Sequence, residues 1–267
     1  MARVADGHYS LSGVDADGTL GIQRKKAEKV LAKRAEQLAE LQNRLFAENR
    51  RSMLIVLQGL DTAGKDGTIK HVMSSTNPQG VDVRGFKQPT PQEQRHQFLW
   101  RIRKALPDRG QIMIFNRSHY EDVLVARVKK LAPERVVESR YEQINRFEEE
   151  ISERRDVTIL KFCLHISYEE QRKRLQARLH VPTKQWKFRD EDIKNRAYWD
   201  EYMAAYDLAI AHCSTSYAPW YVIPANKKWF RNWAVARIVA ETLGEMNPQY
   251  PRPKLDIPAL EAMLRAS

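Results

Sequence analysis

Short apolar runs separated by longer stretches of mixed polar and apolar residues mark the chain between positions 53 and 223. There are five such runs: Met53–Leu57, Val81–Phe86, Gln111–Phe115, Val157–Ile166 and Pro219–Ile223. The first, Met-Leu-Ile-Val-Leu, has no polar position and is rich in branched residues, which predicts a strand buried on both faces. Amphipathic stretches lie between the runs. This alternation predicts an α/β fold with a five-stranded parallel sheet and helices on both faces.

A helical pattern precedes the first strand, from about Gln23 to Glu48. Leu31, Leu38 and Leu45 recur at helical spacing among mostly charged residues, so this amphipathic helix needs a surface to lie on. The body of its own domain is the favoured surface, with a subunit interface as the alternative. Further helices are predicted at 65–75, 91–106, 120–128, 133–154, 168–179 and 229–246. One more helix is predicted to follow the charged stretch 184–196 and to end at Tyr206. The three prolines in residues 248–253 predict an extended tail.

The first strand leads directly into a glycine-rich loop. The pattern Gly59-x-x-x-x-Gly64-Lys65 is that of a phosphate-binding loop between a strand and a helix. Glycines let the backbone fold so that successive N–H groups face one anion. The start of the following helix adds its positive end, and Lys65 adds a mobile charge that can follow a phosphoryl group.

Two carboxylates make this loop unusual. Asp66 stands where Ser or Thr ordinarily binds magnesium, and Asp61 lies inside the loop. Both would repel a phosphate unless a cation were placed between them. We therefore predict that the loop binds a phosphate ligand together with a metal ion.

The end of the third strand is the second candidate for chemistry, because ligands of parallel sheets bind at the carboxyl ends of the strands. Here Asn116 stands where phosphate-loop proteins place a metal-binding Asp. Glu121 and Asp122, one turn later, are candidates to supply the missing charge. Arg117 is predicted to point toward the phosphates, with a surface ion pair as the alternative. His119 is more typical of a structural hydrogen-bond partner than of an acid or base.

Basic residues follow the second and fourth strands. Lys87, in a proline-rich turn, could border a polyanion path or belong to a solvated loop. The helix after the fourth strand and the segment beyond it carry Arg178, Lys184, Lys187 and Arg189. In phosphate-loop kinases a lid occupies this place and excludes water from the reaction. The alternative is a solvated, charged helix.

Composition narrows the possible functions. The formal net charge is +11, which favours polyanionic ligands. Cys163 and Cys213 are too few for a disulfide framework and predict buried thiols in a reducing cytoplasm. No apolar run approaches the length of a membrane span.

A basic nucleic-acid-binding protein fits the charge, but no helix-turn-helix or aromatic RNA-binding signature accompanies it. The Asp15-Ala-Asp17-Gly18-Thr19 segment matches a phosphatase nucleophile loop, yet no strand pattern precedes it, so we predict a turn.

The motifs together resemble the polyphosphate kinase 2 family. The similarity extends from about Gln23 to Pro251 and rests on Gly59–Gly67, Phe115–Asp122, Trp199–Tyr206 and Ala218–Trp229. The form Gly-x-Asp-x-x-Gly-Lys-Asp-Gly is the most specific part, because ordinary phosphate loops lack it. Asn116 followed by His119-Tyr-Glu-Asp resembles the subgroup that phosphorylates both nucleoside mono- and diphosphates.

The resemblance implies a three-layer αβα sandwich of the thymidylate-kinase-like type with a helical lid at about 180–196. It implies transfer between inorganic polyphosphate and purine nucleotides, no membrane, no specific nucleic acid and a homo-oligomer, either dimer or tetramer. Mg²⁺ would be the metal, with Mn²⁺ as a substitute. Residues 1–22 would form a polar tail, 23–251 the phosphate-loop domain and 252–267 a C-terminal tail.

We assign site roles on this basis. The catalytic residues would be Asp61, Lys65, Arg117 and Arg178, and the metal ligands would be Asp61, Asp66 and Asp122. Phosphate or nucleotide binding would involve Gly59, Ala63, Gly64, Asp66, Gly67, Lys87, Asn116 and Lys187. The nearest alternative is a nucleoside monophosphate kinase that uses ATP as donor and shares loop, lid and fold. The pair Asp61 and Asp66 favours polyphosphate over that alternative.

Overall fold

A central sheet of five parallel strands organises the protein. The structure is a computed structural model that describes residues 10–267, so residues 1–9 of the expected polar tail lie outside the described residues. The strand order is β2-β3-β1-β4-β5. Strand β1 lies in the centre, where Ile55 pairs with Ile114 of β3 and Leu160 of β4. The predicted parallel sheet is confirmed.

The strands are Ser52–Gln58 (β1), Val81–Gly85 (β2), Ile112–Asn116 (β3), Val157–His165 (β4) and Trp220–Pro224 (β5). The longer helices are Arg24–Glu48 (α1), Lys65–Val72 (α2), Glu134–Arg155 (α5), Tyr168–His180 (α6), Trp199–Cys213 (α9), Lys228–Met246 (α10) and Ile257–Ala266 (α11). Shorter helices are Trp100–Arg103 (α3), Val125–Val128 (α4), Pro182–Gln185 (α7) and Asp190–Arg196 (α8). Four 3₁₀ turns cover Leu11–Gly13 (η1), Pro78–Gly80 (η2), Glu93–Arg95 (η3) and His119–Asp122 (η4).

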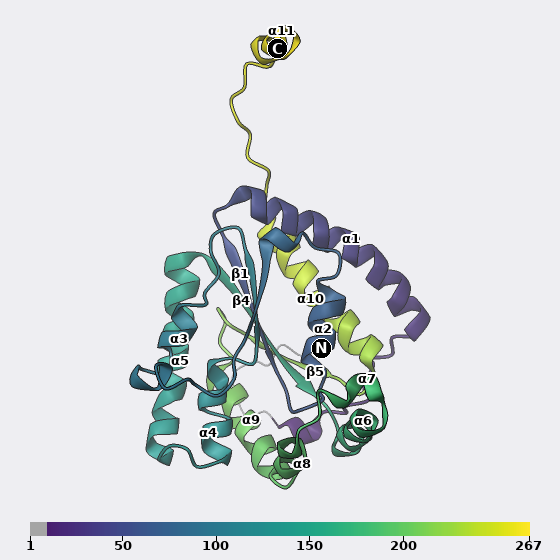
Figure 1. Ribbon diagram of the computed structural model, residues 1–267, viewed down its shortest axis with the longest axis vertical. Coiled ribbons are helices and arrows are strands. Elements are labelled where there is room, and N and C mark those ends of the chain that lie inside the picture. The colour runs from purple at the N-terminus through teal and green to yellow at the C-terminus, as the bar shows by residue number, and fades with distance from the viewer. Residues whose placement is uncertain (1–9) are drawn as a thin grey trace.

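Helices cover both faces of the sheet, which gives the expected three layers (Figure 1). All seven residues of β1 are buried. Met53, Ile55 and Leu57 face the layer of α1, α2 and α10, whereas Leu54 and Val56 face the layer that contains α5 and α9. Helix α1 packs along α10, so the favoured surface for the amphipathic helix, the body of its own domain, is confirmed.

Two predicted helices are largely wrong. Between 91 and 106 only η3 and the four-residue α3 form, because residues 92–97 are all polar and offer no apolar face to bury. Instead His96 stacks on Trp100, with ring centroids 4.0 Å apart. Between 120 and 128 the chain forms η4 and α4 and no continuous helix. Here Tyr120 is completely buried and held by side-chain hydrogen bonds to other elements, which fixes the tighter 3₁₀ turn.

The two ends of the chain also differ in detail from the prediction. Residues 248–253 lie in an extended arm as expected (Figure 1), but the chain then forms the helix α11, which the sequence did not predict. The Asp15–Asp17 segment forms a turn in which the Asp17 N–H donates to Asp15 Oδ1 over 2.8 Å. Within the described residues the segment follows the 3₁₀ turn η1 and no strand, which confirms the turn interpretation. Cys163 and Cys213 are buried, free thiols.

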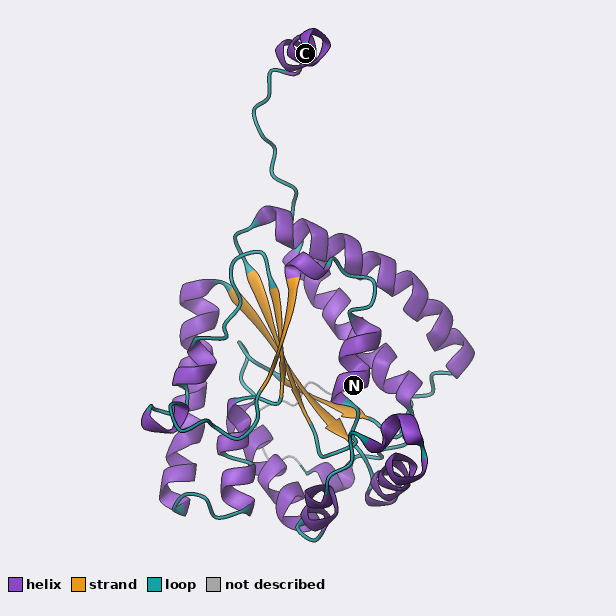
Figure 2. Cartoon of the chain, viewed as in Figure 1, coloured by secondary structure: helices purple, strands orange, loops and turns teal. Residues whose placement is uncertain are grey.

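The carboxyl ends of the strands define the functional edge of the sheet. The arrowheads in Figure 2 converge toward the side where α6, α7 and α8 lie in Figure 1. The loop after β1 and the segment after β3 therefore meet beside these helices. Within residues 10–267, no helix has the length and apolarity that crossing a bilayer requires.

Candidate active site

The loop after β1 has the backbone conformation that its glycines permit. Gly59 and Gly64 have φ angles of 150° and 106°, a region that disfavours side chains. A Cβ at Gly59 would lie 2.8 Å from the Leu164 carbonyl oxygen, and one at Gly64 would lie 1.8 Å from Arg231 Nη1. Both glycines are therefore required for close packing as well as for the turn, and α2 begins directly after Gly64.

Lys65 lies in the first turn of α2 and bends back over the loop. Its Nζ donates to the carbonyl oxygens of Gly59 over 2.6 Å and Leu60 over 3.4 Å. Burial, and then the nearby charge of Arg117, lower the pKa of Lys65 to about 8, against the opposing effect of Asp61. The ammonium group is thus held at the loop by neutral carbonyl groups, which a phosphate could replace.

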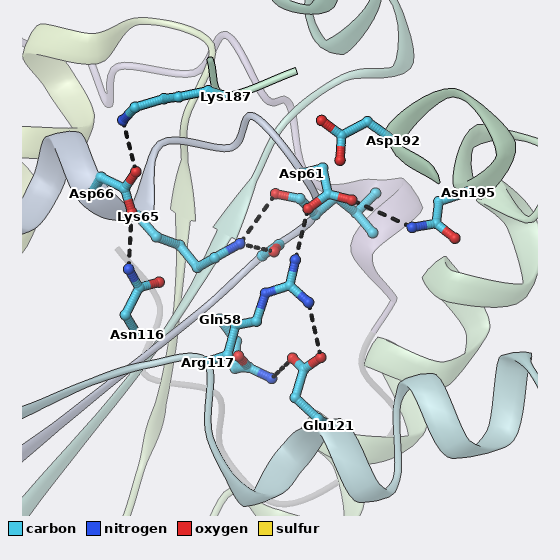
Figure 3. Close-up of polar contacts among 12 residues, drawn as sticks. Gln58, Asp61, Lys65, Asp66, Asn116, Arg117, Glu121, Lys187, Asp192 and Asn195 are labelled. Carbon is cyan, nitrogen blue, oxygen red and sulfur yellow. Dashed lines mark hydrogen bonds and ion pairs between the residues drawn. The ribbon is translucent and has the colours of Figure 1, made fainter. Parts of the chain in front are cut away.

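Asp61 is surrounded by donors. Its Oδ1 accepts from Arg117 Nη2 over 2.8 Å, and its Oδ2 lies 3.5 Å from Asn195 Nδ2 of α8 (Figure 3). Burial alone would raise the pKa of this carboxyl, but Lys65 and Arg117 lower it. Asp61 is therefore ionised at neutral pH, in a position between the loop and the segment after β3.

Asp66 connects the loop with the lid region. Its Oδ1 accepts from Asn116 Nδ2 over 2.9 Å, and its Oδ2 pairs with Lys187 Nζ at 3.0 Å (Figure 3). Although partial burial opposes the shift, the hydrogen bonds from Lys187 and Asn116 lower the pKa of Asp66. Its side chain is 63% exposed, so this carboxylate is open to a ligand in the cavity.

Arg117 is fixed by its backbone and by two carboxylates. Its φ of 64° is left-handed, a conformation that costs a non-glycine residue about 1–3 kcal/mol and is common at functional sites. The guanidinium pairs with Asp61 and, over 3.3 Å, with Glu121, whose other oxygen accepts from Gln58 Nε2. Burial would lower the pKa of Arg117, but Glu121 and Asp61 raise it.

A cavity of about 830 Å³ lies above these residues. Its cationic lining, within the described part of the chain, comprises Lys65, Lys87, Arg117, Arg174, Arg178, Lys184, Lys187, Arg189, Lys228 and Arg231. Three carboxylates, Asp61, Asp66 and Asp192, also line it. The excess of ten cations over three anions makes the cavity suited to a ligand with several negative charges. A second cavity of about 120 Å³ shares Asp61 and Arg117 with the first.

The lid region contributes the upper wall of the larger cavity. Arg178 at the end of α6 pairs with Asp192 of α8 at 2.7 Å. Burial, and then the charge of Asp61, raise the pKa of Asp192 despite that arginine. Trp186, between α7 and α8, is 76% exposed. The Arg178–Asp192 pair holds α6 and α8 together, and the centroid of the exposed Trp186 ring lies 4.9 Å from Lys187 Nζ.

The structure brings most of the sequence-predicted residues together, with three exceptions. Gly59 lines only the smaller cavity, and Ala63 is fully buried below the loop. Asp122 lines neither cavity and lies 3.8 Å from Arg140 and 3.9 Å from Arg101. Because its carboxylate lines neither cavity, unlike those of Asp61 and Asp66, we do not retain Asp122 as a metal ligand.

Comparison with known proteins agrees with the motifs. The family Polyphosphate kinase 2 matches residues 21–251. The chain is 49% identical over 251 residues to an AMP/ADP-polyphosphate phosphotransferase of Meiothermus ruber, covering 93% of this chain and 94% of the relative. The chain belongs to the polyphosphate kinase 2 family. A crystal structure of polyphosphate kinase 2 from Arthrobacter aurescens matches with a TM-score of 0.95 and 44% identity, over 99% of this chain and 95% of that one.

Another relative in the family is the ADP-polyphosphate phosphotransferase of Rhodopseudomonas palustris, with 42% identity over 83% of this chain and 81% of the relative. The family's phosphate-loop kinase fold confirms the predicted α/β sandwich.

This member of the polyphosphate kinase 2 family contains a buried polar cluster under η4. Lys161 Nζ of β4 donates to the Tyr120 hydroxyl over 2.8 Å and pairs with Glu148 of α5. His119 Nε2 lies 3.1 Å from the Glu148 carboxylate, and all four side chains are fully buried. The structural role predicted for His119 is confirmed. The cluster fixes the segment that carries Arg117 and Glu121.

Several residues at the site were missed by sequence reasoning. Asn195 contacts Asp61, Asp192 contacts Arg178, and Arg231 lies against Gly64. Each is more than a dozen positions from its partner, and no short motif relates them. Arg231 carried one usable signal, because it stands among the apolar residues Phe230, Trp233 and Ala234 of α10.

Proposed function

We propose that the protein transfers phosphoryl groups between inorganic polyphosphate and AMP and ADP, forming ADP and ATP reversibly. The observation that carries this proposal is a phosphate loop with two carboxylates, placed in a cavity with ten cationic side chains. An internal polyphosphate unit carries about one negative charge, so a long cationic lining suits the chain. The relatives' names support the same substrates.

The residues around Lys65 would stabilise charge during transfer. Phosphoryl transfer has a loose transition state, so the protein mainly positions groups and neutralises charge. Lys65 and Arg117 would contact the transferred phosphoryl, and Arg178 would approach from the lid. The acceptor phosphate is already ionised, so no strong general base is required. The buried position of His119 is consistent with that.

The residues present fit a magnesium ion. Magnesium usually retains several waters and uses one or two carboxylates plus substrate phosphates. Asp61 and Asp66 are two carboxylates with lowered pKa that line the cavity, and Asn116 adds a neutral amide oxygen beside Asp66. We propose that these residues hold Mg²⁺, with Mn²⁺ as a substitute. The ion would neutralise charge on the phosphates of the substrates.

The nearest alternative remains an ATP-dependent nucleoside monophosphate kinase. Purified protein should be incubated with polyphosphate, Mg²⁺ and either AMP, ADP, GMP or GDP, with no ATP present. We expect ADP and ATP from AMP, and no product in the Lys65→Ala variant. If wild type forms ADP from AMP only when ATP is supplied, the alternative is correct and polyphosphate is not the donor.

We also propose that the protein is a homo-oligomer in a reducing cytoplasm, where two unpaired thiols are stable. Helix α11 supports the first part: Ile257, Leu260 and Leu264 are 50%, 42% and 76% exposed. An isolated ten-residue helix is unstable in water, and Figure 1 shows an extended arm that carries α11 away from its own body. A second copy of the chain is the proposed surface for this helix, as the dimers and tetramers expected for the family would provide.

Light scattering on the full chain and on a chain that ends at Asn247 tests this arm. Because the arm carries an apolar helix that its own body does not cover, truncation should lower the molar mass to that of a smaller assembly. A Leu260→Ser/Leu264→Ser double variant should do the same, whereas a Glu261→Gln control should not. An unchanged mass in both variants would refute the arm as an oligomer contact.

A further inference from the structure

Three cationic side chains of the described residues are buried, namely Arg101, Lys161 and Arg231. Lys161 pairs with Glu148, and Arg101 lies 3.9 Å from both Glu93 and Asp122. Arg231 is only 2% exposed, yet within residues 10–267 no carboxylate forms an ion pair with it. Buried charges in proteins are ordinarily paired, because an uncompensated one is strongly destabilising. Arg231 is therefore an exception that needs a physical explanation.

Neutral oxygens hold the Arg231 guanidinium in place. Its Nε and Nη2 donate to Asn232 Oδ1 over 3.2 Å and 2.8 Å, and its Nη1 donates to the Ala63 carbonyl oxygen over 3.2 Å. Gly64 and Gly67 approach it so closely that a Cβ would lie 1.8 Å from Nη1 at the first and 3.1 Å from Nη2 at the second. The group is thus fixed directly beneath the phosphate loop.

The surroundings of Arg231 are unfavourable for a cation. Arg231 lies in the first turn of α10, where the helix dipole is positive and disfavours a positive side chain. Burial, and then the nearby Arg174, lower the pKa of Arg231 to about 10. Lys228 is close enough that Arg174, Lys184 and Arg231 all lower its pKa as well, after burial. An anion placed here would relieve all of these repulsions.

We propose that Arg231 and Lys228 form a phosphate subsite that binds the donor chain next to the transferred phosphoryl group. Both side chains line the large cavity, and Arg231 contacts Gly64, the residue before Lys65. AMP has a single phosphate, and that phosphate must face the transferred group. A polyphosphate has further phosphates to occupy the subsite. The inference rests on the proposed function and adds Arg231 to its binding residues.

Substitution at Arg231 tests the subsite. We expect Arg231→Gln to raise the KM for long polyphosphate about tenfold or more, the loss expected for a charge-assisted contact. The KM for AMP should change less than about twofold, and kcat at saturating donor less than about threefold. Arg231→Lys keeps the charge but lacks the planar guanidinium group, so its KM for polyphosphate should lie between those of wild type and Arg231→Gln. The Arg237→Gln variant of the same helix is the control, because Arg237 is partly exposed and pairs with Glu241.

Thermal unfolding separates binding from a structural role. Without ligand, Arg231→Gln should unfold at the wild-type temperature or above, because the substitution removes an uncompensated buried charge. Added tripolyphosphate should raise the unfolding temperature of wild type more than that of the variant. An unchanged donor KM, or a drop in stability with equal losses for donor and AMP, would overturn the subsite. If wild type does not use polyphosphate at all, the proposed function fails instead.

Discussion

The two ends of the large cavity differ in how their cationic side chains are neutralised. At the loop end, defined by Asp61, Lys65 and Arg117, each cation has carboxylates close by, and Asp61 lies only 2.8 Å from Arg117. At the α10 end, defined by Lys228 and Arg231, the buried guanidinium donates its hydrogen bonds to neutral oxygens, and no carboxylate within residues 10–267 pairs with it. The loop end is balanced and able to accommodate a metal ion with its phosphates. The α10 end carries positive charge that its neighbours do not neutralise and that an anion would stabilise. The two ends are therefore suited to different parts of one polyanion.

The largest effect is expected at the loop end. Lys65→Ala removes the mobile charge at the transferred phosphoryl, so kcat should fall by about 10³-fold or more. Stability should change little, because the ammonium group is partly desolvated and donates its hydrogen bonds to the carbonyl oxygens of Gly59 and Leu60. Steady-state rates and thermal unfolding of the same preparation check both statements. Turnover near that of wild type would refute the role of the loop.

The pH dependence should follow the same lysine. Its pKa is lowered to about 8, and the protonated, active form exists below that pKa. Therefore kcat/KM should decline as pH rises through about 8, approaching tenfold per pH unit. Profiles between about pH 6.5 and pH 10 measure this. The Lys65→Arg variant, however low its activity, should lack the decline, because an arginine keeps its charge. If kcat/KM still declines with pH in this variant, a group other than Lys65 causes the decline.

A smaller effect is expected for the metal requirement. Asp61→Asn keeps the shape of the side chain but removes one carboxylate, so the Mg²⁺ concentration for half-maximal rate should rise about tenfold. A magnesium titration at fixed polyphosphate measures the change. Asp122→Asn is the matched comparison, because that carboxylate faces Arg101 and Arg140 outside the cavity. Equal shifts in both variants would contradict the division of roles between these two aspartates.

The smallest effect is expected at the lid. Lys187 pairs with Asp66 across the cavity, but both side chains are substantially exposed, and exposed pairs contribute about 0.2–1 kcal/mol. Lys187→Ala should therefore raise the KM for polyphosphate only about two- to fivefold. Lys194→Ala, which removes an exposed pair with Glu191 on α8, is the control. A loss as large as that of Lys65→Ala would mean that the lid, and not the loop, dominates transfer.

Local sequence patterns predicted the α/β fold and the residues at the loop end of the cavity. The apolar run of β1 and the spacing of Gly59, Gly64 and Lys65 are contiguous in the sequence, so the strand, the loop and the start of α2 were predictable. Asn116 and Arg117 followed from the rule that ligands bind where parallel strands end. These features depend on neighbours a few residues away, which a sequence displays directly.

Features that depend on distant partners could not be predicted. Asp122 was predicted as a metal ligand, but in the folded chain it lines neither cavity and lies beside Arg101 and Arg140. The predicted helix at 91–106 was wrong for a local reason, because residues 92–97 are all polar and offer no apolar face to bury. Arg231 approaches Gly64 across 167 positions of sequence, so no short motif indicated its role. Which charges pair, and that no carboxylate within residues 10–267 pairs with Arg231, is a property of the folded chain.

The most direct test follows labelled phosphate. Polyphosphate carrying ³²P should be mixed with unlabelled AMP and Mg²⁺, without ATP, and label in ADP measured for wild type, Lys65→Ala and Arg231→Gln. We expect transfer by wild type at all donor concentrations, transfer by Arg231→Gln only when donor is plentiful, and almost none by Lys65→Ala. Absence of label in ADP from wild type would contradict polyphosphate as donor. Equal failure of both variants at saturating donor would contradict the separate roles of the two ends.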